Sequence, residues 1–363
     1  MKILVTGACG FVGSTLIQGL LESQSLFGGP LEIVGLDNFS RPGSKQNEPR
    51  LEKLGVDFRR GDIRQPDDLA NLPAVDWVLD CAANPSVLAG ATKDSSSREL
   101  IDNNLIGTIN LLEQCKKHKS GFLLLSTSRV YSIPPLASLS MLTTNDAFAL
   151  DTATSLPPGI SDDGISESFF TTPPLSLYGA SKLTSETLAL EYGHCFDFPV
   201  WINRCGVLAG AGQFGRVDQG IFSFWINSHL RRAPLRYLGF NGSGYQTRDC
   251  LHPNDLLQLL AKQIQTSSKT IPPICNLGGG PTNAMSLKQL TSWCNDRFGT
   301  HYVESTPETR SFDLPWVVMD AQLARDLWDW EAQTPLTSIL EEIASHAEAH
   351  PNWITISNPT SKT

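Results

Sequence analysis

Tyr178 and Lys182 are the residues whose types and spacing best suit proton-transfer chemistry in this sequence. They begin a segment with helical periodicity, so positions i and i+4 share a face and the phenol and ammonium are expected side by side. A free phenol has a pKa of about 10, too high for a good base at neutral pH, and a nearby cation favours its phenolate form. The pair is therefore a candidate general base with its helper.

A group of hydroxyls at 126–128 offers a second candidate, because Ser126, Thr127 and Ser128 follow an apolar run. If that run is a parallel strand, the hydroxyls lie at the edge where such sheets place their ligands. A hydroxyl there can hydrogen-bond a substrate oxygen as its proton leaves. The alternative is that the hydroxyls cap the next element, and for Ser128 we prefer this interpretation.

The elements that must position these groups begin with a glycine-rich turn. Gly7, Gly10 and Gly13 follow the first apolar run and open an amphipathic segment that includes Phe11 and Val12. Glycines at these positions let the chain turn tightly and approach a pyrophosphate, and the helix N-terminus offers unpaired N–H groups to phosphates. The turn predicts a dinucleotide-binding site.

Acidic residues after the next apolar runs refine this prediction. Asp37 closes the second run, where a carboxylate accepts the adenosine ribose hydroxyls and repels the extra phosphate of NADP. The predicted cofactor is therefore NAD, although the nearby Arg41 weakens the inference. Asp62 and Ile63 follow the third run and are expected to edge the adenine pocket; a simple turn aspartate is the alternative.

Short apolar runs alternate with amphipathic segments throughout residues 1–205. Several runs are apolar almost throughout, as in parallel strands that are buried on both faces. The alternation predicts an α/β fold, a Rossmann doubly wound parallel sheet with a smaller mixed α/β substrate-binding part. The expected strands are Lys2–Thr6, Glu32–Leu36, Val56–Arg59, Trp77–Ala82, Phe122–Ser126 and Val200–Asn203.

The same alternation predicts how the chain is divided into two parts. Residues 1–205 are predicted to form the NAD-binding domain, with 246–268 returning to it, and residues 206–245 and 269–353 the substrate-binding part. The stretch 132–174 is rich in Pro, Ser, Thr and Asp without clear periodicity, so we expect an inserted loop that is either a functional lid or a surface excursion. Residues 354–363 are expected to be a polar tail.

Composition narrows the class of protein. The net charge of -9 argues against a nucleic-acid or anionic-membrane partner. The 8 cysteines are scattered without a Cys-x-x-Cys pair, which indicates thiols in a reducing compartment rather than disulfides or a metal site. We find no signal-peptide pattern and no apolar run long enough to span a bilayer, so we expect a cytoplasmic protein.

Together these motifs resemble the extended short-chain dehydrogenase/reductase family, which contains the NAD-dependent sugar-nucleotide epimerases and dehydratases. The stretch 126–131 is similar to the family's strand-end motif, which implies that Thr127 is the catalytic hydroxyl, Tyr178 the base and Lys182 its helper. Asn104 matches an asparagine of the family's fourth helix, and Arg248 matches an arginine that grips the nucleotide diphosphate. The resemblance implies a nucleotide-diphosphate sugar as substrate, and a homodimer built through helices in 95–117 and 178–195.

The resemblance and the motifs together assign site residues. Expected at the cofactor are Gly7, Gly10, Phe11, Val12, Gly13, Asp37, Asn38, Ser40, Arg41, Asp62, Ile63, Ala82, Ala83, Asn104, Tyr178 and Lys182. Expected at the substrate are Thr127, Ser128, Arg204, Gln213, Gln219, Arg248, Arg310 and Asp313.

Within the family, the stretches 37–41, 213–220 and 244–249 are most similar to the CDP-paratose 2-epimerases, which implies epimerisation at C2 of a CDP-hexose. Val207 and Pro315 depart from residues that many relatives carry and leave the base and sugar open. The alternatives are a UDP-sugar 4-epimerase, a sugar-nucleotide 4,6-dehydratase, and a non-catalytic dinucleotide-binding regulator. The dehydratase is disfavoured because Ser128-Arg129 stands where dehydratases place an acid pair.

Overall fold

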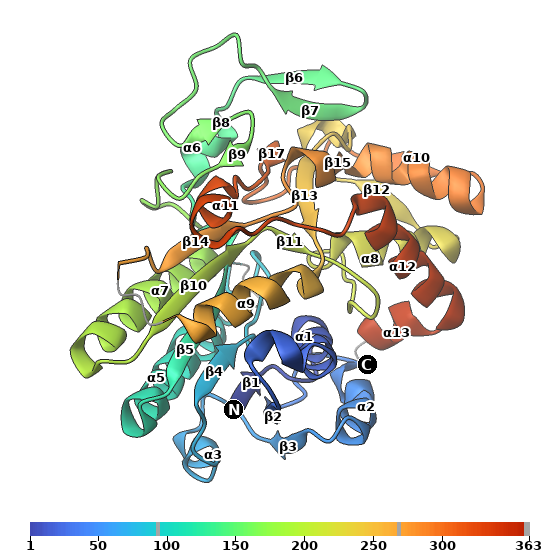
Figure 1. Cartoon of the computed structure of the whole chain (residues 1–363). Helices are drawn as coiled ribbons and strands as arrows, with labels where there is room; N and C mark the ends of the chain where they lie inside the picture. The colour runs from blue at the N-terminus through green and yellow to red at the C-terminus, as the bar shows by residue number, and fades with distance from the viewer. Residues whose placement is uncertain (92–94, 267–269, 359–363) are drawn as a thin grey trace.

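A seven-stranded parallel sheet with helices on both faces organises the protein (Figure 1). The computed structural model describes residues 1–91, 95–266 and 270–358. The strand order is β14-β10-β5-β4-β1-β2-β3, which confirms the predicted Rossmann fold. The strands are β1 (Lys2–Thr6), β2 (Glu32–Asp37), β3 (Asp57–Arg60), β4 (Trp77–Asp80), β5 (Gly121–Thr127), β10 (Val200–Cys205) and β14 (Ile274–Leu277).

Side chains of the central strands alternate between two apolar layers. In β1, Ile3 and Val5 join a core with α1 (Phe11–Glu22), α9 (Leu256–Gln265) and α11 (Gln322–Trp328). Leu4 joins the opposite core with α3 (Pro66–Ala70), α5 (Gly107–His118) and α7 (Leu177–Phe196). Burial on both faces explains why these runs are apolar almost throughout.

A smaller mixed sheet and three helices form the second part of the protein. β13 (Thr247–Leu251) pairs with β11 (Val207–Leu208), β15 (Ala284–Ser286) and β17 (Trp316–Val317). The helices α8 (Ile221–Leu230), α10 (Leu287–Phe298) and α12 (Leu336–Ala349) share one apolar cluster. β12 (Leu235–Tyr237) and β16 (Val303–Ser305) form a separate pair. Two short helices of the first part are α2 (Glu48–Lys53) and α4 (Ser97–Ile101).

The predicted division of the chain needs two corrections. β14 lies within 269–353, which the sequence assigned to the substrate-binding part, yet it is an edge strand of the main sheet beside β10. Within the described residues 246–266, α9 packs on the main sheet, whereas β13 pairs in the smaller sheet and contributes Leu251 to the core between them.

The expected polar tail is also different. α13 (Trp353–Ser357) is helical, Trp353 and Ser357 are buried, and Trp353 stacks on Phe214 with 4.9 Å between ring centroids. Residues 359–363 of the predicted tail lie outside the described residues.

The insertion at 132–174 contains regular structure rather than the single loop expected. It holds α6 (Ile133–Ala137) and two antiparallel pairs, β6 (Met141–Thr144) with β7 (Ala147–Leu150) and β8 (Ile160–Ser161) with β9 (Gly164–Ile165). Its apolar side chains share a cluster with β17, so the insertion packs on the smaller sheet. A lid function for it stays a prediction.

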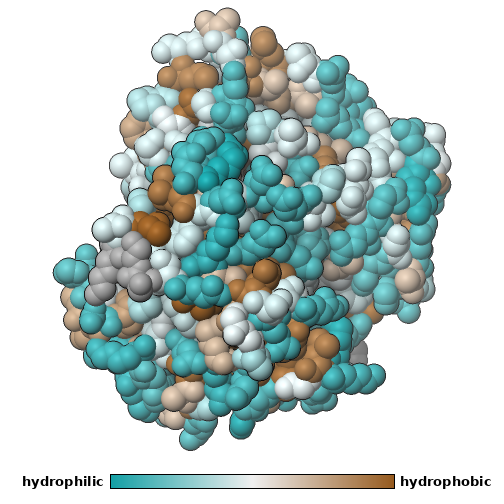
Figure 2. Space-filling view, in the orientation of Figure 1, coloured by the Kyte–Doolittle hydropathy of each residue, from teal (hydrophilic) through white to brown (hydrophobic). Residues whose placement is uncertain are grey.

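On the face of the protein shown in Figure 2, apolar side chains lie in separate patches. Figure 2 shows that hydrophilic side chains dominate this face, with separate brown areas among them. Across 1–91, 95–266 and 270–358, no helix combines the length and the apolar character that crossing a membrane requires.

Candidate active site

A cavity of about 600 Å³ opens at the carboxyl ends of the sheet strands and extends to the smaller part of the protein. This is the edge at which doubly wound sheets bind ligands. It brings most of the predicted site residues together. Those that line it are Gly7, Gly10, Phe11, Val12, Gly13, Asp37, Asn38, Ser40, Arg41, Ile63, Ala82, Ala83, Thr127, Ser128, Tyr178, Gln213, Gln219, Arg248, Arg310 and Asp313. Asp62, Asn104, Lys182 and Arg204 do not line it.

The glycine turn forms a cradle that side chains would fill. Gly7 has a φ of 59°, a left-handed conformation that favours glycine. A Cβ on Gly13 would lie 2.2 Å from the carbonyl oxygen of Gly7, so the turn and the start of α1 can approach this closely only with glycine there. Gly10 provides no side-chain cap, which leaves the first N–H groups of α1 available at the cavity. The turn fits the pyrophosphate of a dinucleotide.

Asp37 stands at the end of β2 with its carboxylate held by the turn. Its oxygens accept hydrogen bonds from the backbone N–H groups of Cys9, at 2.9 Å, and Phe39, at 2.7 Å. Burial raises the pKa of Asp37, and these N–H groups oppose the shift. The carboxylate is thus fixed at the place where a ribose hydroxyl can donate to it.

Asp62 does not line the cavity but contacts Asn38, which does. Its carboxylate pairs with Arg64 at 2.6 Å and accepts from the Asn38 amide at 3.0 Å. Asp62 orients Asn38, while its neighbour Ile63 lines the cavity; a direct contact of Asp62 with adenine stays a prediction.

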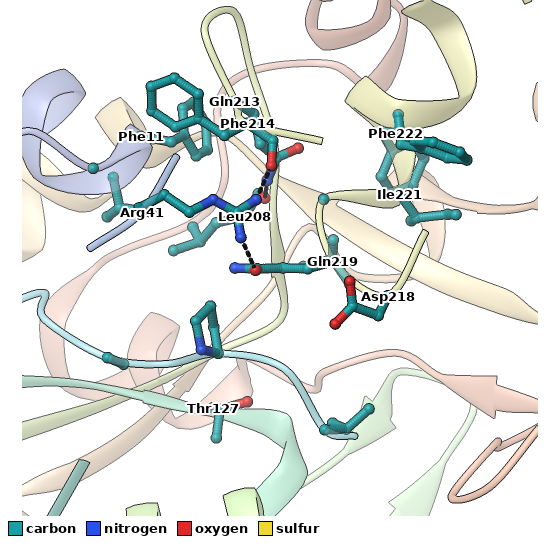
Figure 3. Close-up of a pocket in the computed structure, with 18 of the residues that line it drawn as sticks. Phe11, Arg41, Thr127, Leu208, Gln213, Phe214, Asp218, Gln219, Ile221 and Phe222 are labelled. Carbon is teal, nitrogen blue, oxygen red and sulfur yellow. Dashed lines mark hydrogen bonds between the residues drawn. The ribbon is translucent and has the colours of Figure 1, made fainter. Parts of the chain in front are cut away.

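Residues 211–220, here called the strap, close one side of the cavity. Arg41 donates hydrogen bonds to the carbonyl of Phe214 and to the side chain of Gln219, and Figure 3 shows it extended toward both, with Thr127 on the other side of the pocket. Ser86 donates to the carboxylate of Asp218 at 2.6 Å. The strap is therefore joined to two loops of the main sheet.

Gln213 also belongs to the strap, and its amide is largely engaged within the second part of the protein. Its Nε2 donates to the carbonyl of Leu208 at 2.7 Å, while its buried Oε1 has no hydrogen-bond partner. That oxygen is the part of Gln213 left to accept from a ligand.

Tyr178 and Thr127 both line the cavity and lie within hydrogen-bond reach of each other. Ser176 caps α7 by accepting from the N–H of Gly179 at 3.2 Å, which places Tyr178 in the first turn. Thr127 ends β5, and a hydrogen bond from its side chain favours the phenolate form of Tyr178. The cap of the following turn is Thr127, whose Oγ1 accepts from the N–H of Arg129 at 3.2 Å, and not Ser128, the hydroxyl for which we preferred that role.

Charges around the phenol differ from those expected. Burial raises the pKa of Tyr178, and Thr127 and Arg129 oppose the shift. Lys182 lies on the next turn, where burial lowers its pKa against the charges of Asp80 and Glu186. Arg129, which the sequence did not assign to the site, is a cation whose charge favours the phenolate form of Tyr178, and the helper role of Lys182 stays a prediction.

Asn104 is a buried structural link rather than a cavity residue. Its Oδ1 accepts from the N–H of Asn84 at 2.8 Å, and its Nδ2 donates to the carbonyl of Asn84 and to Ser181. It lies in a π-helical turn, Asp102–Ile106, and fixes α7 against the loop that follows β4. The predicted cofactor contact is therefore an indirect one.

Arg204 was expected at the substrate and is instead buried beneath the site. Its guanidinium pairs with Glu186 at 2.7 Å and donates to the hydroxyl of Tyr131 at 3.3 Å. Glu186 also accepts from Ser126. These contacts join β5, β10 and α7, the elements that carry Thr127 and Tyr178, so the prediction of substrate binding is replaced by a structural role.

Two arginines mark the far end of the cavity. Arg248 pairs with Asp313 at 3.4 Å and donates to the carbonyl of Leu314 at 2.8 Å. Arg310 lines the same region. Burial lowers the pKa of Arg248, while Asp313 opposes the shift. With one carboxylate for two guanidiniums, this end suits a diphosphate.

Sequence reasoning missed several lining residues. Arg129 stands inside the recognised 126–131 motif, and its charge was the available signal. Asp218 lies in the strap. No local pattern marks the apolar wall beside the arginines, because its residues come from elements distant in sequence; they are Phe222, Trp225, Leu235, Met285, Leu287 and Leu290.

Comparison with known proteins identifies the family. The model of the NAD dependent epimerase/dehydratase family matches residues 3–278. The chain belongs to this family. It is thus an NAD-dependent enzyme of the epimerase/dehydratase class, as the sequence predicted, and the glycine cradle and Asp37 fit that cofactor.

Similar proteins within the family differ in their reactions. A CDP-paratose 2-epimerase from Salmonella typhi is 28% identical over 339 residues, which cover 91% of this chain and 94% of that protein. A dTDP-glucose 4,6-dehydratase from Streptomyces antibioticus is 27% identical over 332 residues, with 90% and 87% covered. The crystal structure of UDP-glucuronic acid 4-epimerase from Bacillus cereus with UDP-glucuronic acid and NAD has a TM-score of 0.75 and 27% identity, with 96% and 99% covered.

Proposed function

We propose that this enzyme is a nucleotide-sugar epimerase that inverts C2 of a CDP-hexose by transient oxidation of the sugar hydroxyl. The observation that carries the proposal is that the hydroxyl residues Thr127 and Tyr178 line one cavity together with the glycine cradle and the two arginines. The similarity to a CDP-paratose 2-epimerase supports the choice of base and carbon.

The residues of the chain have distinct roles in this reaction. Tyr178 takes the proton from the sugar hydroxyl at its phenolic oxygen and later returns it, while Thr127 hydrogen-bonds the same hydroxyl. NAD, when bound, would supply the acceptor and the donor for the hydride of the sugar carbon. Arg248 and Arg310 hold the diphosphate, and Lys182, one helical turn after Tyr178, is the residue we expect to reach the cofactor ribose.

A dehydratase needs an acid that assists loss of water from the sugar, and the cavity places its carboxylates elsewhere. Among the described lining residues, Asp37 is held by the glycine turn, Asp218 by Ser86, and Asp313 by Arg248. The position after Thr127 carries Ser128 and then a cation. These contacts favour an epimerase.

A second candidate is a UDP-sugar 4-epimerase, which the similarity to the UDP-glucuronic acid 4-epimerase favours. The two reactions use the same hydroxyl pair and differ in which sugar carbon faces it. The carbon that is oxidised therefore distinguishes them.

The test is to incubate the NAD-loaded enzyme with CDP-, UDP-, dTDP- and GDP-hexoses and to resolve the products by NMR. We expect inversion at C2 of a CDP-hexose, with a primary isotope effect when deuterium replaces the C2 hydrogen. Inversion at C4 with a C4 isotope effect would establish the 4-epimerase, and a 4-keto-6-deoxy product the dehydratase. If NAD is bound and no sugar gives a product, the epimerase proposal fails and the non-catalytic regulator is the alternative that fits.

The matched variants are Tyr178→Phe and Tyr302→Phe. Removing the Tyr178 hydroxyl should lower kcat by at least roughly 100-fold, because general acid–base groups contribute about that much. Tyr302 is 79% exposed and serves as the control, with activity unchanged. Full turnover by Tyr178→Phe would overturn the mechanism.

A further inference from the structure

The short helix α13, near the end of the described chain, contacts the strap directly. The Nε1 of Trp353 donates a hydrogen bond to the carbonyl of Gln213 at 2.9 Å. The ring of Trp353 stacks on that of Phe214, with 4.9 Å between the centroids and an interplanar angle of 19°. The Nδ2 of Asn358 donates to the carbonyl of Gly215 at 2.8 Å. α13 therefore holds three consecutive residues of the strap.

The loop that follows β2 meets the strap and α13 at the same place. Gly43 in this loop has a φ of 87°, and a Cβ on it would lie 2.7 Å from Cγ2 of Ile356 and 2.8 Å from the ring of Phe214. Arg41, in the same loop, donates to the carbonyl of Phe214, as Figure 3 shows. Phe214 is thus held at its ring by α13 and at its carbonyl by Arg41.

These contacts hold one wall of the cavity. Gln213, Phe214 and Gln219 of the strap line the cavity together with Asp37 and Arg41. Because Arg41 joins the strap to the loop that begins after Asp37, the strap stands beside the place that fits the ribose of NAD. Movement of the strap away from Arg41 would open this side of the cavity.

The preceding helix, α12, supports the arrangement. The ring of Trp353 is 5% exposed and packs edge-on against His346, with 4.6 Å between the centroids. Glu342, one turn earlier in α12, accepts from the N–H of Ala211 at 3.2 Å. The strap is therefore held at its start by α12 and at its centre by α13, so that loss of the Trp353 side chain would release the centre alone.

We propose that Trp353 is a positioning residue that acts through Gln213 and Phe214: it holds the strap against Arg41 and thereby slows the release of NAD. This gives α13 a function where the sequence predicted a polar tail. The inference rests on the proposed function in one respect, that an epimerisation leaves no net oxidation and so requires no exchange of NAD between turnovers. The release of the cofactor itself can be measured without any sugar.

The test measures cofactor release from the full-length enzyme. Each protein is loaded with NADH and mixed with excess NAD in a stopped-flow instrument, and the decay of NADH fluorescence gives the dissociation rate. Trp353→Leu removes both the N–H and the stacked ring and should raise this rate about tenfold. Trp353→Phe keeps a ring but loses the N–H, so its rate should rise only about threefold. Thr355→Ala changes an exposed residue of the same helix and should leave the rate unchanged.

A second variant separates this role from plain packing. Asn358→Ala removes the hydrogen bond to Gly215 without disturbing a buried ring and should raise the dissociation rate about threefold. The folding of every variant is followed by circular dichroism and urea-induced unfolding. If Trp353 only stabilised the fold, Trp353→Leu would lower the unfolding midpoint while the folded holoenzyme released NADH at the wild-type rate, and this result would overturn the inference.

The remaining outcomes are also decisive. If Trp353→Leu does not fold, Asn358→Ala and Trp353→Phe decide, and wild-type dissociation rates in both would overturn the inference. Faster release from the variants, combined with no inverted sugar from the wild-type enzyme, would uphold the role of Trp353 and remove the proposed function. Inverted sugar from the wild type, with unchanged release in all variants, would do the reverse.

Discussion

The pair Arg204–Glu186 provides a sharp test of the structural role assigned to Arg204. The two side chains are 6% and 2% exposed, and Arg204 donates from Nε at 3.1 Å and from Nη2 at 2.7 Å to the carboxylate. Removing one partner of a buried pair leaves an uncompensated charge, which typically costs about 3–5 kcal/mol. We expect Arg204→Met alone and Glu186→Leu alone each to lower the free energy of unfolding by an amount in that range.

Removing both charges should restore most of this loss. Apolar replacement of a whole buried pair is often neutral, so the double variant Arg204→Met with Glu186→Leu should unfold within roughly 2 kcal/mol of the wild type. The measurement is urea-induced unfolding followed by circular dichroism, with NAD affinity and KM for the substrate recorded on the double variant. Arg59→Met removes an exposed cation that pairs with Asp57 and should leave the unfolding midpoint unchanged.

The reasoning fails on either of two results. A double variant as unstable as the single variants would show that the pair contributes more than mutual neutralisation, through the contact of Arg204 with Tyr131 or of Glu186 with Ser126. A double variant that is stable but has lost substrate affinity would restore Arg204 to the substrate site, where the sequence placed it.

Three further predictions concern the cofactor and pH. Gly13→Ala should lower NAD affinity by roughly 10- to 100-fold, measured by calorimetry, because its Cβ would force the carbonyl of Gly7 to move. Asp218→Ala removes the hydrogen bond from Ser86 to the strap and should speed NAD dissociation about tenfold in stopped-flow experiments. Burial, with the charge of a neighbouring histidine, lowers the pKa of His346 from 6.5 to about 4, so its contribution to stability is present above pH 6.5 and lost as pH falls toward 4. His346→Gln should flatten the dependence of unfolding on pH in that window; an unchanged slope would assign it to other groups.

Local patterns were enough to predict the dinucleotide half of the site. β1, the glycine turn and Asp37 are neighbours in sequence, and each demands a residue type that few alternatives satisfy. Tyr178 could be predicted for the same reason, because its helix carries its helper one turn away. The fold followed from apolar runs that are buried on both sides of the sheet.

Long-range contacts account for what the sequence missed. The sequence suggested that Arg204 binds the substrate, because its charge suits an anionic ligand. The packing of α7 against β10 shows instead that Glu186 neutralises this charge. Ile274–Leu277 is too short to be predicted as a strand of the main sheet from its sequence alone. Its pairing with β10 defines it as one. The two-residue strands at 160–165 are below the length at which alternation can be recognised.

The place of β14 at the edge of the main sheet, next to β10, has a consequence for how this protein can be built and changed. A fragment that stops at residue 205 would expose the backbone of β10 as an open edge and would invite aggregation. The two parts of the protein are therefore not independent units, and neither can be removed or exchanged with that of another enzyme. New specificity must arise by substitution within the intact chain.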